Sequence, residues 1–247
     1  METKGNTVLI TGGSTGIGFG FAKRLVELGN TVIICGRRKE KLEEAENAIP
    51  EIHTVRCDIS NELDRRQLFS QVTREYPDLN ILINNAGIQR RVDFTKGMQD
   101  LGDADQEIEI NFKAQIHVTG MFLPVLLEKK NGAIVNVTSG LGLIPLSIFP
   151  VYSATKAAMH SFTISLRHQL RHSNLKVFEV IPPTVYDTYL KGRPMDRNDY
   201  SISTSEMTDA FIEGLKKDSY EITAGQTVRW ANASKREVDE IFNMMNH

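Results

Sequence analysis

The stretch TVLITGGSTGIG, residues 7–18, decides the expected fold. Residues 7–10 form an apolar run typical of a buried strand, and a helical pattern begins after Gly18. Between them, Gly12, Gly16 and Gly18 allow a tight turn and a close approach of the backbone to a pyrophosphate, while the following helix offers free N–H groups. The order strand, glycine loop and helix favours a nucleotide site, although a glycine-rich turn alone is as often a plain structural loop.

Apolar runs of strand length alternate with helical patterns along the chain. The strands are expected near residues 6–11, 31–36, 53–57, 80–84, 133–138 and 176–181. Helices between successive strands imply right-handed crossovers, a parallel sheet with helices on both faces, and a ligand at the carboxyl ends of the strands. The pattern predicts an α/β fold: one Rossmann-type, doubly wound parallel sheet that occupies residues 1–247 as a single domain.

Composition limits the possible partners. With 29 Lys and Arg against 31 Asp and Glu, the formal net charge is -2, which argues against nucleic acid or an anionic membrane as a partner. No apolar stretch approaches a membrane span and the start lacks a secretory signal, so we expect a cytoplasmic protein without membrane insertion. Cys35 and Cys57 lack the spacing of a metal or redox pair, which favours buried thiols and no metal site. A small molecule is the expected partner.

A second set of residues can move a proton on and off an oxygen. Ser139 follows a buried strand, Tyr152 comes thirteen residues later, and Lys156 four residues after the tyrosine. On a helix, that last spacing places Tyr152 and Lys156 on one face. A lysine charge favours the phenolate, so we expect Lys156 to lower the pKa of Tyr152 from its ordinary value of about 10. Taken alone, the pair also occurs by chance on amphipathic helices, solvated or half-buried.

Together these motifs resemble the short-chain dehydrogenase/reductase family. The resemblance rests on residues 11–18, the NNAG motif at residues 84–87, Asn111, Ser139, Tyr152 and Lys156, and it extends from residue 7 to about residue 188. More narrowly, residues 30–37, 84–89 and 154–161 resemble a bacterial branch named after D-alanine esterification of teichoic acids. Nothing in the sequence supports action on teichoic acid itself.

The resemblance implies hydride transfer between a nicotinamide and a carbonyl or alcohol carbon. Tyr152 would act as general acid or base, and Ser139 would donate a hydrogen bond to the substrate oxygen. Lys156 would also hold the nicotinamide ribose hydroxyls, and Asn111 would position a water that links Lys156 to solvent. Without the resemblance, a local hydrogen bond inside a helix is the simpler interpretation of Asn111.

The end of the second strand indicates which nicotinamide cofactor binds. NAD-preferring folds place an acid there, but this chain has Gly36-Arg37-Arg38 and no carboxylate before Glu40. The Arg37 guanidinium, with Arg38 beside it, suits a 2′-phosphate, so we expect NADP(H), with NAD(H) still possible. Alternatively, Arg37 solvates the strand end or stacks on adenine. Some NADP enzymes of the family carry a basic residue before the second glycine, where this chain has Thr15.

Further cofactor contacts follow from the resemblance, position by position. The full set is Gly12, Ser14, Thr15, Gly16, Ile17, Gly18, Arg37, Arg38, Asp58, Ile59, Asn84, Ala86, Gly87, Tyr152, Lys156, Pro182 and Val185. Asp58 would bond the adenine amino group or cap the next helix, for which Ser60 is the stronger candidate. Asn84 is as well explained by a structural hydrogen bond. Pro182 begins a double proline where the family usually has Pro-Gly, and Val185 would bind the carboxamide through its backbone.

The substrate is less well defined. Polar, irregular sequence after Pro182 resembles a substrate lid, expected at about residues 184–215, with a helix at 204–217 and a strand at 220–223. The expected pocket residues are Leu141, Leu143, Ile144, Phe149 and Pro183, with Gln89, Arg90 and Arg91 near the cofactor mouth. The apolar set favours an apolar carbonyl or alcohol substrate, whereas the two arginines could instead recognise an acidic group. By resemblance, the helices at 112–127 and 151–170 would form a homodimer or homotetramer.

Two other functions fit the same motifs. A nucleotide-binding redox sensor or regulatory module would need none of Ser139, Tyr152 and Lys156. A non-redox epimerase or dehydratase on this fold would hold its nucleotide tightly and consume none. Turnover with any carbonyl compound separates these alternatives from a dehydrogenase.

Overall fold

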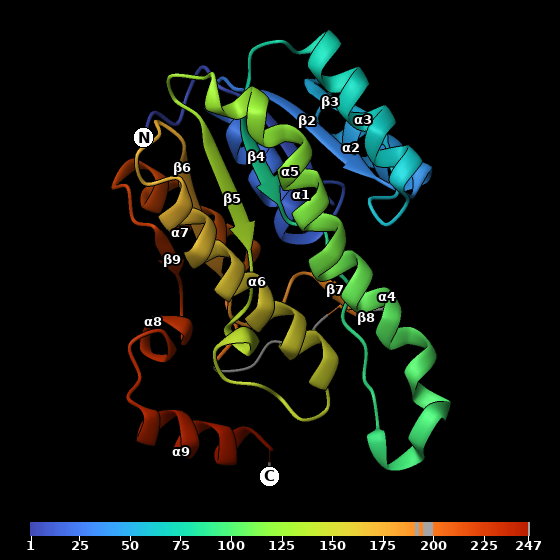
Figure 1. Ribbon diagram of the computed structural model, residues 1–247, viewed down its shortest axis with the longest axis vertical. Helices are drawn as coiled ribbons and strands as arrows, with labels where there is room; N and C mark the ends of the chain where they lie inside the picture. The colour runs from blue at the N-terminus through green and yellow to red at the C-terminus, as the bar shows by residue number, and fades with distance from the viewer. Residues whose placement is uncertain (191–192, 195–199, 247) are drawn as a thin grey trace.

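The computed structural model describes residues 1–190, 193–194 and 200–246. Its centre is a seven-stranded parallel sheet of order β3-β2-β1-β4-β5-β6-β9 (Figure 1). The strands are β1 (Thr7–Thr11), β2 (Thr31–Gly36), β3 (Ile52–Arg56), β4 (Leu79–Asn84), β5 (Ala133–Val137), β6 (Lys176–Ile181) and β9 (Glu221–Thr223). The expected doubly wound α/β fold is confirmed, and the strands expected at the sequence level end within one residue of these bounds.

Helices cover both faces of the sheet. Residues of α1 (Gly16–Glu27), α2 (Lys39–Ala48) and α7 (Thr204–Lys216) share one core, and those of α3 (Glu62–Glu75), α5 (Ala114–Leu127) and α6 (Pro150–Gln169) share the other. Successive strand residues alternate between these cores: Val8 and Ile10 belong to the first and Leu9 to the second. Burial on both sides explains the continuous apolar runs of the strands.

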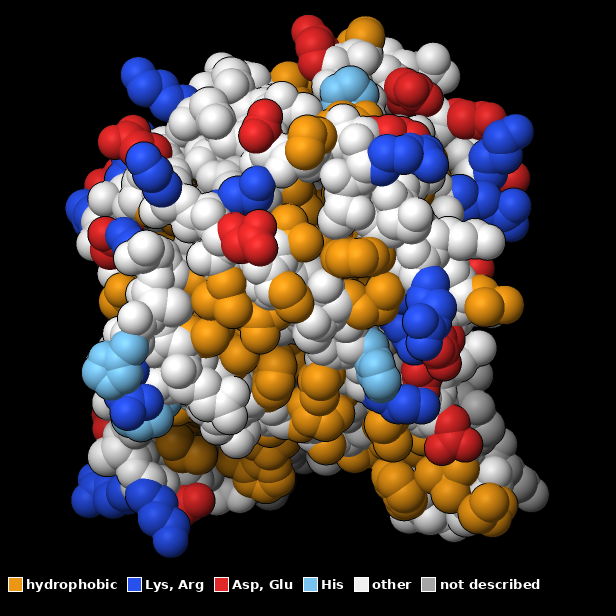
Figure 2. Space-filling model, turned by 45° about the horizontal axis from the view of Figure 1, so that its top comes forward, with side chains coloured by type: hydrophobic (Ala, Val, Ile, Leu, Met, Phe, Trp, Pro, Cys, Tyr) orange, Lys and Arg blue, Asp and Glu red, His pale blue; other side chains and the backbone are white. Residues whose placement is uncertain are grey.

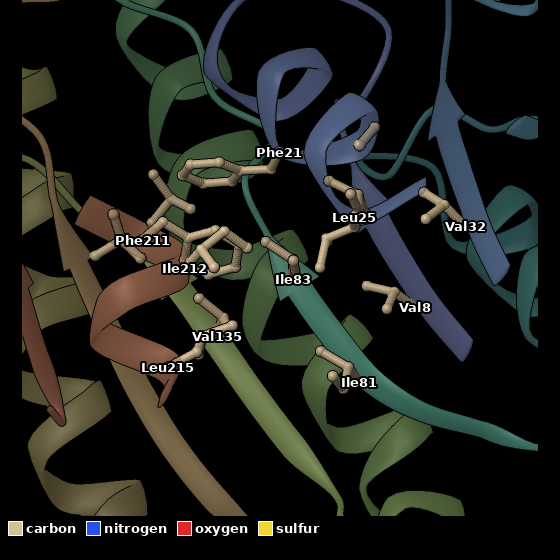
Figure 3. Close-up of a cluster of buried hydrophobic side chains, with 14 of the residues drawn as sticks. Val8, Phe21, Leu25, Val32, Ile81, Ile83, Val135, Phe211, Ile212 and Leu215 are labelled. Carbon is tan, nitrogen blue, oxygen red and sulfur yellow. The ribbon is translucent and has the colours of Figure 1, made fainter. Parts of the chain in front are cut away.

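Helix α7 forms the last part of the predicted lid. Phe211 on α7 stacks on Phe21 of α1 with ring centroids 4.2 Å apart, and Ile212 and Leu215 reach the same cluster as Val135 of β5 (Figure 3). These contacts place residues 204–215 in the main core, because the apolar side of α7 covers the sheet. The predicted lid, at about residues 184–215, therefore includes a helix that packs in the main core.

The first part of the predicted lid is also tied to the body. Tyr186 N donates to Ile202 O and Ile202 N donates to Thr184 O, both at 3.0 Å. Asp187 Oδ1 accepts from Thr204 N and Thr204 Oγ1 at 2.7 Å. Between these anchors, β7 (Tyr189–Leu190) pairs with β8 (Arg193–Pro194). The rest of the predicted lid includes residues 191–192 and 195–199, which lie outside the described residues, so the lid stays a prediction.

Short elements complete the chain around the carboxyl ends of the strands. They are η1 (Phe94–Asp103), α4 (Ala104–Ile108), the π-turn η2 (Glu109–Lys113), η3 (Gly140–Gly142), α8 (Thr227–Trp230) and α9 (Lys235–Asn246). A small separate core of Ile144, Trp230 and Ile241 holds α8 and α9 against the segment that follows η3. The C-terminal segment thereby comes to lie beside the loop that follows β5.

The outer surface of α5 and α6 is unusually apolar. Helix α5, AQIHVTGMFLPVLL, contains no Asp, Glu, Lys or Arg, and it leaves Leu127 40% exposed, while Ile164 on α6 is 44% exposed. Figure 2 shows apolar side chains gathered in the middle of this face, with charged side chains mainly toward its margins. Within the described residues, no helix is both long and apolar enough to cross a membrane.

Candidate active site

A cavity of about 1870 Å³ opens at the carboxyl ends of the strands. It runs from the glycine loop and the end of β2 to the loop after β5, helix α6 and the C-terminal segment. The predicted site residues that line it are Gly12, Ser14, Thr15, Gly16, Ile17, Gly18, Arg37, Arg38, Asp58, Ile59, Ala86, Gly87, Ser139, Tyr152, Lys156, Pro182 and Val185. Asn84 and Asn111 are not among the lining residues.

Close packing explains two of the loop glycines. A Cβ added to Gly12, whose φ is 65°, would lie 2.8 Å from Ala86 Cα, and one added to Gly18 would lie 2.3 Å from Asn85 Nδ2. That amide donates to the carbonyl oxygens of Thr11 and Gly12, both at 3.0 Å. Asn85 thus ties the glycine loop to the end of β4. No role was predicted for Asn85, although its place in the NNAG motif was a signal.

The N-terminus of α1 fits a diphosphate. Its N-cap residue, Thr15, makes no side-chain cap, and its first turn contains no acidic residue. The first N–H groups of the helix are therefore not bound by a capping side chain, and they carry the positive end of the helix dipole. Gly16 has a φ of 59° and Thr188 is the nearest side chain, 3.5 Å from a Cβ placed there. These features match a dinucleotide's pyrophosphate.

The end of β2 presents two exposed arginines to the cavity. Arg37 and Arg38 both line it, and neither has an ion pair with a carboxylate among the described residues. The nearest acid in sequence, Glu40, lies in the first turn of α2. Both guanidinium groups are therefore available for a phosphate.

Asp58 lines the cavity, but the predicted cap of α3 is wrong. Asp58 Oδ1 accepts hydrogen bonds from Ser60 N at 3.0 Å and from Ser60 Oγ at 2.7 Å. Because the Ser60 hydroxyl is used in this turn, α3 is capped by Asn61, whose Oδ1 accepts from Leu63 N at 2.8 Å. Asp58 is therefore not the cap either, and its place in the cavity wall leaves the adenine contact as its predicted role.

Asn84 lies inside the sheet rather than in the cavity wall. It is fully buried, and its Nδ2 donates to Thr119 Oγ1 and to Asn136 Oδ1, both at 2.8 Å. Asn136 Nδ2 extends this series of hydrogen bonds by donating to Thr163 Oγ1 at 2.9 Å. This buried network links β4 and β5 to α5 and α6, and it supports the structural alternative for Asn84.

Ser139 and Tyr152 come together in the wall of the cavity. Ser139 caps η3, accepting from Leu141 N at 3.1 Å, and Tyr152 lies in the first turns of α6. Burial raises the pKa of Tyr152 to about 12, and a hydrogen bond with Ser139 acts in the opposite direction. The phenol is therefore protonated near neutral pH, as a general acid must be.

Lys156 does not act on Tyr152 as predicted. Its Nζ donates to Val137 O at 2.8 Å and lies 5.7 Å from the centre of the Tyr152 ring. Burial lowers the pKa of Lys156 to about 8, and the charge of Glu179 opposes that shift. Desolvation is the largest cause of the shift at both groups, so the pKa of Tyr152 rises instead of falling.

Asn111 lies behind the cavity, at the π-turn between α4 and α5. Its Nδ2 donates to Ile88 O at 2.8 Å and to Thr155 Oγ1 at 3.2 Å, and its Oδ1 accepts from Ile88 N at 2.8 Å. A Cβ at Gly87 would lie 3.4 Å from Asn111 Oδ1 and 3.6 Å from Lys156 Nζ. Asn111 thus couples the loop after β4 to α6. Such π-turns are frequent at functional sites.

The predicted substrate pocket is partly corrected. Leu141, Phe149, Pro183, Gln89, Arg90 and Arg91 line the cavity, as do the unpredicted residues Leu146, Gln226, Trp230 and Met245. Ile144 is instead fully buried in the C-terminal core, and Leu143 packs against that core. The C-terminal residues were missed because their proximity depends on how α8 and α9 pack. The described residues include no group of three or more His, Cys, Asp or Glu arranged to hold a metal.

Comparisons with known proteins agree with this geometry. The family model described as short chain dehydrogenase matches residues 6–197. Uncharacterized oxidoreductase DltE of Bacillus subtilis (strain 168) is 47% identical over 249 residues, which cover 100% of this chain and 98% of that protein. NADP-dependent 3-hydroxy acid dehydrogenase YdfG of Salmonella typhi is 31% identical over 182 residues, or 73% of each chain.

Solved structures show the same fold. A short chain dehydrogenase from Burkholderia cenocepacia J2315, in complex with NADP, has a TM-score of 0.84 at 27% identity and covers 99% of both chains. A short chain dehydrogenase/reductase from Burkholderia phymatum, in complex with NAD, has a TM-score of 0.82 at 20% identity, covering 100% of this chain and 97% of that one. The family match spans most of the sequence and contains Ser139, Tyr152 and Lys156. The chain therefore belongs to the short-chain dehydrogenase/reductase family of oxidoreductases.

Proposed function

We propose that the protein is an NADP(H)-dependent oxidoreductase that transfers a hydride between the nicotinamide and a small carbonyl or alcohol substrate. One observation carries the proposal: a single cavity is lined by Arg37 at one end and by Ser139, Tyr152 and Lys156 at the other. A phosphate-binding cation and a proton-transfer group thus border the same space. The name of one relative and the solved complex of another include NADP, whereas a third is a complex with NAD, so the preference for NADP(H) rests on Arg37.

The cofactor would lie along the cavity wall. The N-terminus of α1, with Ser14, Thr15 and Ile17, would hold the diphosphate, and Arg37 with Arg38 would hold the 2′-phosphate. Asp58 and Ile59 would contact the adenine, Ala86 and Gly87 the adenosine ribose, Lys156 the nicotinamide ribose, and Pro182 and Val185 the carboxamide side. When bound, the nicotinamide supplies or accepts the hydride.

The chain's own residues would manage the proton and the charge. Tyr152, whose pKa is raised to about 12, carries a proton at neutral pH and would give it to the substrate oxygen during reduction. Ser139 would donate a hydrogen bond to the same oxygen, where negative charge develops. In the oxidation direction Tyr152 must first lose its proton, so oxidation should accelerate as the pH rises.

The remaining expectations are part of the same proposal. Residues 184–203 would contribute to a substrate lid, the apolar face of α5 and α6 would form the contact of a homodimer or homotetramer, and the protein would be cytoplasmic. A redox sensor and a non-redox epimerase or dehydratase are the alternatives. Neither would consume NADPH stoichiometrically with a carbonyl compound.

The cofactor experiment uses Arg37→Ala, with Arg74→Ala as the matched control. Arg74 is an exposed arginine that pairs with Glu75 on α3 and does not line the cavity. Loss of one exposed charged contact to phosphate should weaken NADPH binding about tenfold while leaving NADH binding nearly constant. Nicotinamide fluorescence titration measures both. Equal binding of the two cofactors, or tighter NADH binding, would contradict the assignment of Arg37.

Turnover is tested separately with a panel of carbonyl compounds. The wild-type protein should oxidise NADPH stoichiometrically with at least one of them. Tyr152→Phe should keep NADPH binding and lower turnover by a factor of about 10² to 10⁴, because the general acid is removed. Cofactor binding without turnover of any carbonyl compound would favour the sensor or the non-redox alternative.

A further inference from the structure

The substrate end of the cavity combines an apolar wall with positive charge. Leu141, Leu146, Phe149, Trp230 and Met245 form the wall near Ser139 and Tyr152, and Arg90 and Arg91 come from the loop after β4. Among the described residues, the carboxylates that line the cavity are Glu27, Glu44, Asp58, Asp187 and Asp209. They belong to α1, α2, α7 and the loops beside them, on the cofactor side. Among the described lining residues, those at the substrate end therefore include basic side chains and no acidic one.

The two arginines differ in the contacts that they make within the protein. Arg90 Nη2 donates to Gln106 Oε1 at 2.8 Å, and Arg90 N donates to the fully buried Glu107 at 2.6 Å. Glu107 is not a lining residue, so its carboxylate lies behind the loop. Arg91 is exposed, and it forms no ion pair with a carboxylate among the described residues. Arg91 is therefore the arginine available to a ligand.

Arg91 lies over an aromatic ring. Its guanidinium carbon lies 5.9 Å from the centre of the Phe149 ring, and Phe149 is the residue that precedes α6. A cation–π contact does not use the N–H donors at the edge of the guanidinium, and those donors suit carboxylate or phosphate oxygens. Phe149 O also accepts from Ser153 N, beside Tyr152. The Arg91 guanidinium thus contacts the residue at the start of α6, the helix that carries Tyr152.

The loop that carries Arg91 is fixed on its other side. Asn111 binds both backbone groups of Ile88, and Glu107 binds the N–H of Arg90. Val92, the next residue after Arg91, is buried. An arginine at such a position loses less conformational freedom on binding than one on a mobile loop. These contacts make Arg91 a prepared binding group rather than a freely solvated side chain.

We propose that Arg91 recognises an anionic group, a carboxylate or a phosphate, on the carbonyl or alcohol substrate. The apolar remainder of that substrate would contact Leu146 and Trp230, with its reactive oxygen at Tyr152. The proposal rests on the proposed hydride-transfer function and narrows its substrate to an anionic compound. It also replaces the purely apolar substrate that the pocket residues favoured at the sequence level.

Matched aldehydes test this substrate class by NADPH oxidation. 4-Carboxybenzaldehyde is compared with its neutral methyl ester, methyl 4-formylbenzoate, and 4-formylphenyl phosphate distinguishes a phosphate preference from a carboxylate preference. We expect kcat/KM to favour one of the anions over the ester by about 10- to 100-fold, the range for a charged hydrogen-bonded contact. A wild-type protein that shows no preference, or that prefers the ester, would overturn the proposal while leaving the proposed reductase function intact.

Variants assign the preference to Arg91. In Arg91→Ala and in Arg91→Gln, which keeps more of the side chain's length, the ratio of anion to ester should fall to about one. In Arg74→Ala, the exposed control on α3, the ratio should equal that of the wild-type protein. A preference that survives in both Arg91 variants would overturn the assignment.

Binding can be measured independently of turnover because the only tryptophan of the chain, Trp230, lines this end of the cavity. Quenching of its fluorescence reports the affinity of each aldehyde for the protein–NADP⁺ complex. Tighter binding of the anion, lost in Arg91→Ala, supports the proposal even where NADPH is not oxidised. In that case the reductase function fails and the anion site stands. Equal affinities for anion and ester refute the anion site.

Discussion

Glu179→Gln tests how the fold controls the charge of Lys156. Glu179 lies in β6 and is fully buried, and its Oε1 accepts from Thr138 Oγ1 at 2.7 Å. Its two carboxylate oxygens lie 3.0 and 2.9 Å from His160 Nδ1, on the helix that carries Tyr152 and Lys156. The negative charge of Glu179 holds the pKa of Lys156 up against burial. The variant removes this charge while keeping the size of the side chain.

The expected magnitudes follow from burial. Without the carboxylate, only desolvation acts strongly on Lys156, so its pKa should fall further below about 8. Breaking a buried ion pair costs about 3 to 5 kcal/mol. Here His160 is half-buried and glutamine still accepts from Thr138, so the free energy of unfolding should fall by a smaller amount, about 2 kcal/mol.

The assay is the pH dependence of kcat/KM for NADPH oxidation. Activity that needs the Lys156 ammonium is lost as the pH rises through its pKa, so the alkaline limb should move to lower pH in Glu179→Gln. His160→Gln is the matched control, because it breaks the same pair and keeps the carboxylate. An alkaline limb that coincides in Glu179→Gln and the wild-type protein would refute the role of Glu179.

Stability provides a second readout. Hydrogen bonding to Glu179 raises the pKa of His160 above its ordinary value of about 6.5. This stabilisation is fully present below about pH 6.5 and is lost as the pH rises through the raised pKa. The free energy of unfolding of the wild-type protein, measured in urea, should therefore decrease as the pH rises across that window. In both variants this decrease should be smaller.

Two further predictions concern packing. Gly18→Ala forces Asn85 away from the glycine loop. It should therefore lower the free energy of unfolding, measured by thermal denaturation, by about 1 to 3 kcal/mol and weaken NADPH binding. Gly120→Ala is the control and should have neither effect, because a Cβ there meets nothing within 4 Å. Phe211→Ala should lower the free energy of unfolding in urea by about 3 to 5 kcal/mol, because Phe211 is buried in the main core. Ser205→Ala, at an exposed position of the same helix, should change it by no more than about 0.5 kcal/mol. A small effect at Phe211 would contradict the packing of α7 in the core.

Local patterns predicted the strands well because each strand is buried on both faces and appears as a continuous apolar run. The helix at α7 was also placed correctly, but its packing against α1 could not be predicted from its sequence. Met207, Phe211 and Leu215 are compatible with any apolar contact, and only the position of α1 shows that they belong to the main core. Secondary structure was a local property here, whereas the function of an element depended on its neighbours.

Polar residues were harder to assign because several side chains compete for the same backbone groups. Ser60 and Asn61 are both good caps, and the competition was decided by Asp58, which binds the Ser60 hydroxyl. Asn84 and Asn85 are neighbours of the same type, yet one faces the interior of the sheet and the other the glycine loop. Asn84 is the last residue of β4 and Asn85 follows it, so their side chains leave the backbone on different sides.

The proton chemistry of the site shows most clearly where the sequence stops being sufficient. The spacing of Tyr152 and Lys156 correctly predicted a shared helix, and it implied that the lysine would lower the tyrosine pKa. In the structure the Lys156 ammonium donates a hydrogen bond to the carbonyl oxygen of Val137 in β5, and the charge of Glu179 in β6 raises its pKa. These two residues lie 19 and 23 positions from Lys156 in the sequence. Desolvation then raises the pKa of the phenol and lowers that of the amine. Because two strands and a helix set these values together, only their assembly could have determined the direction of either shift.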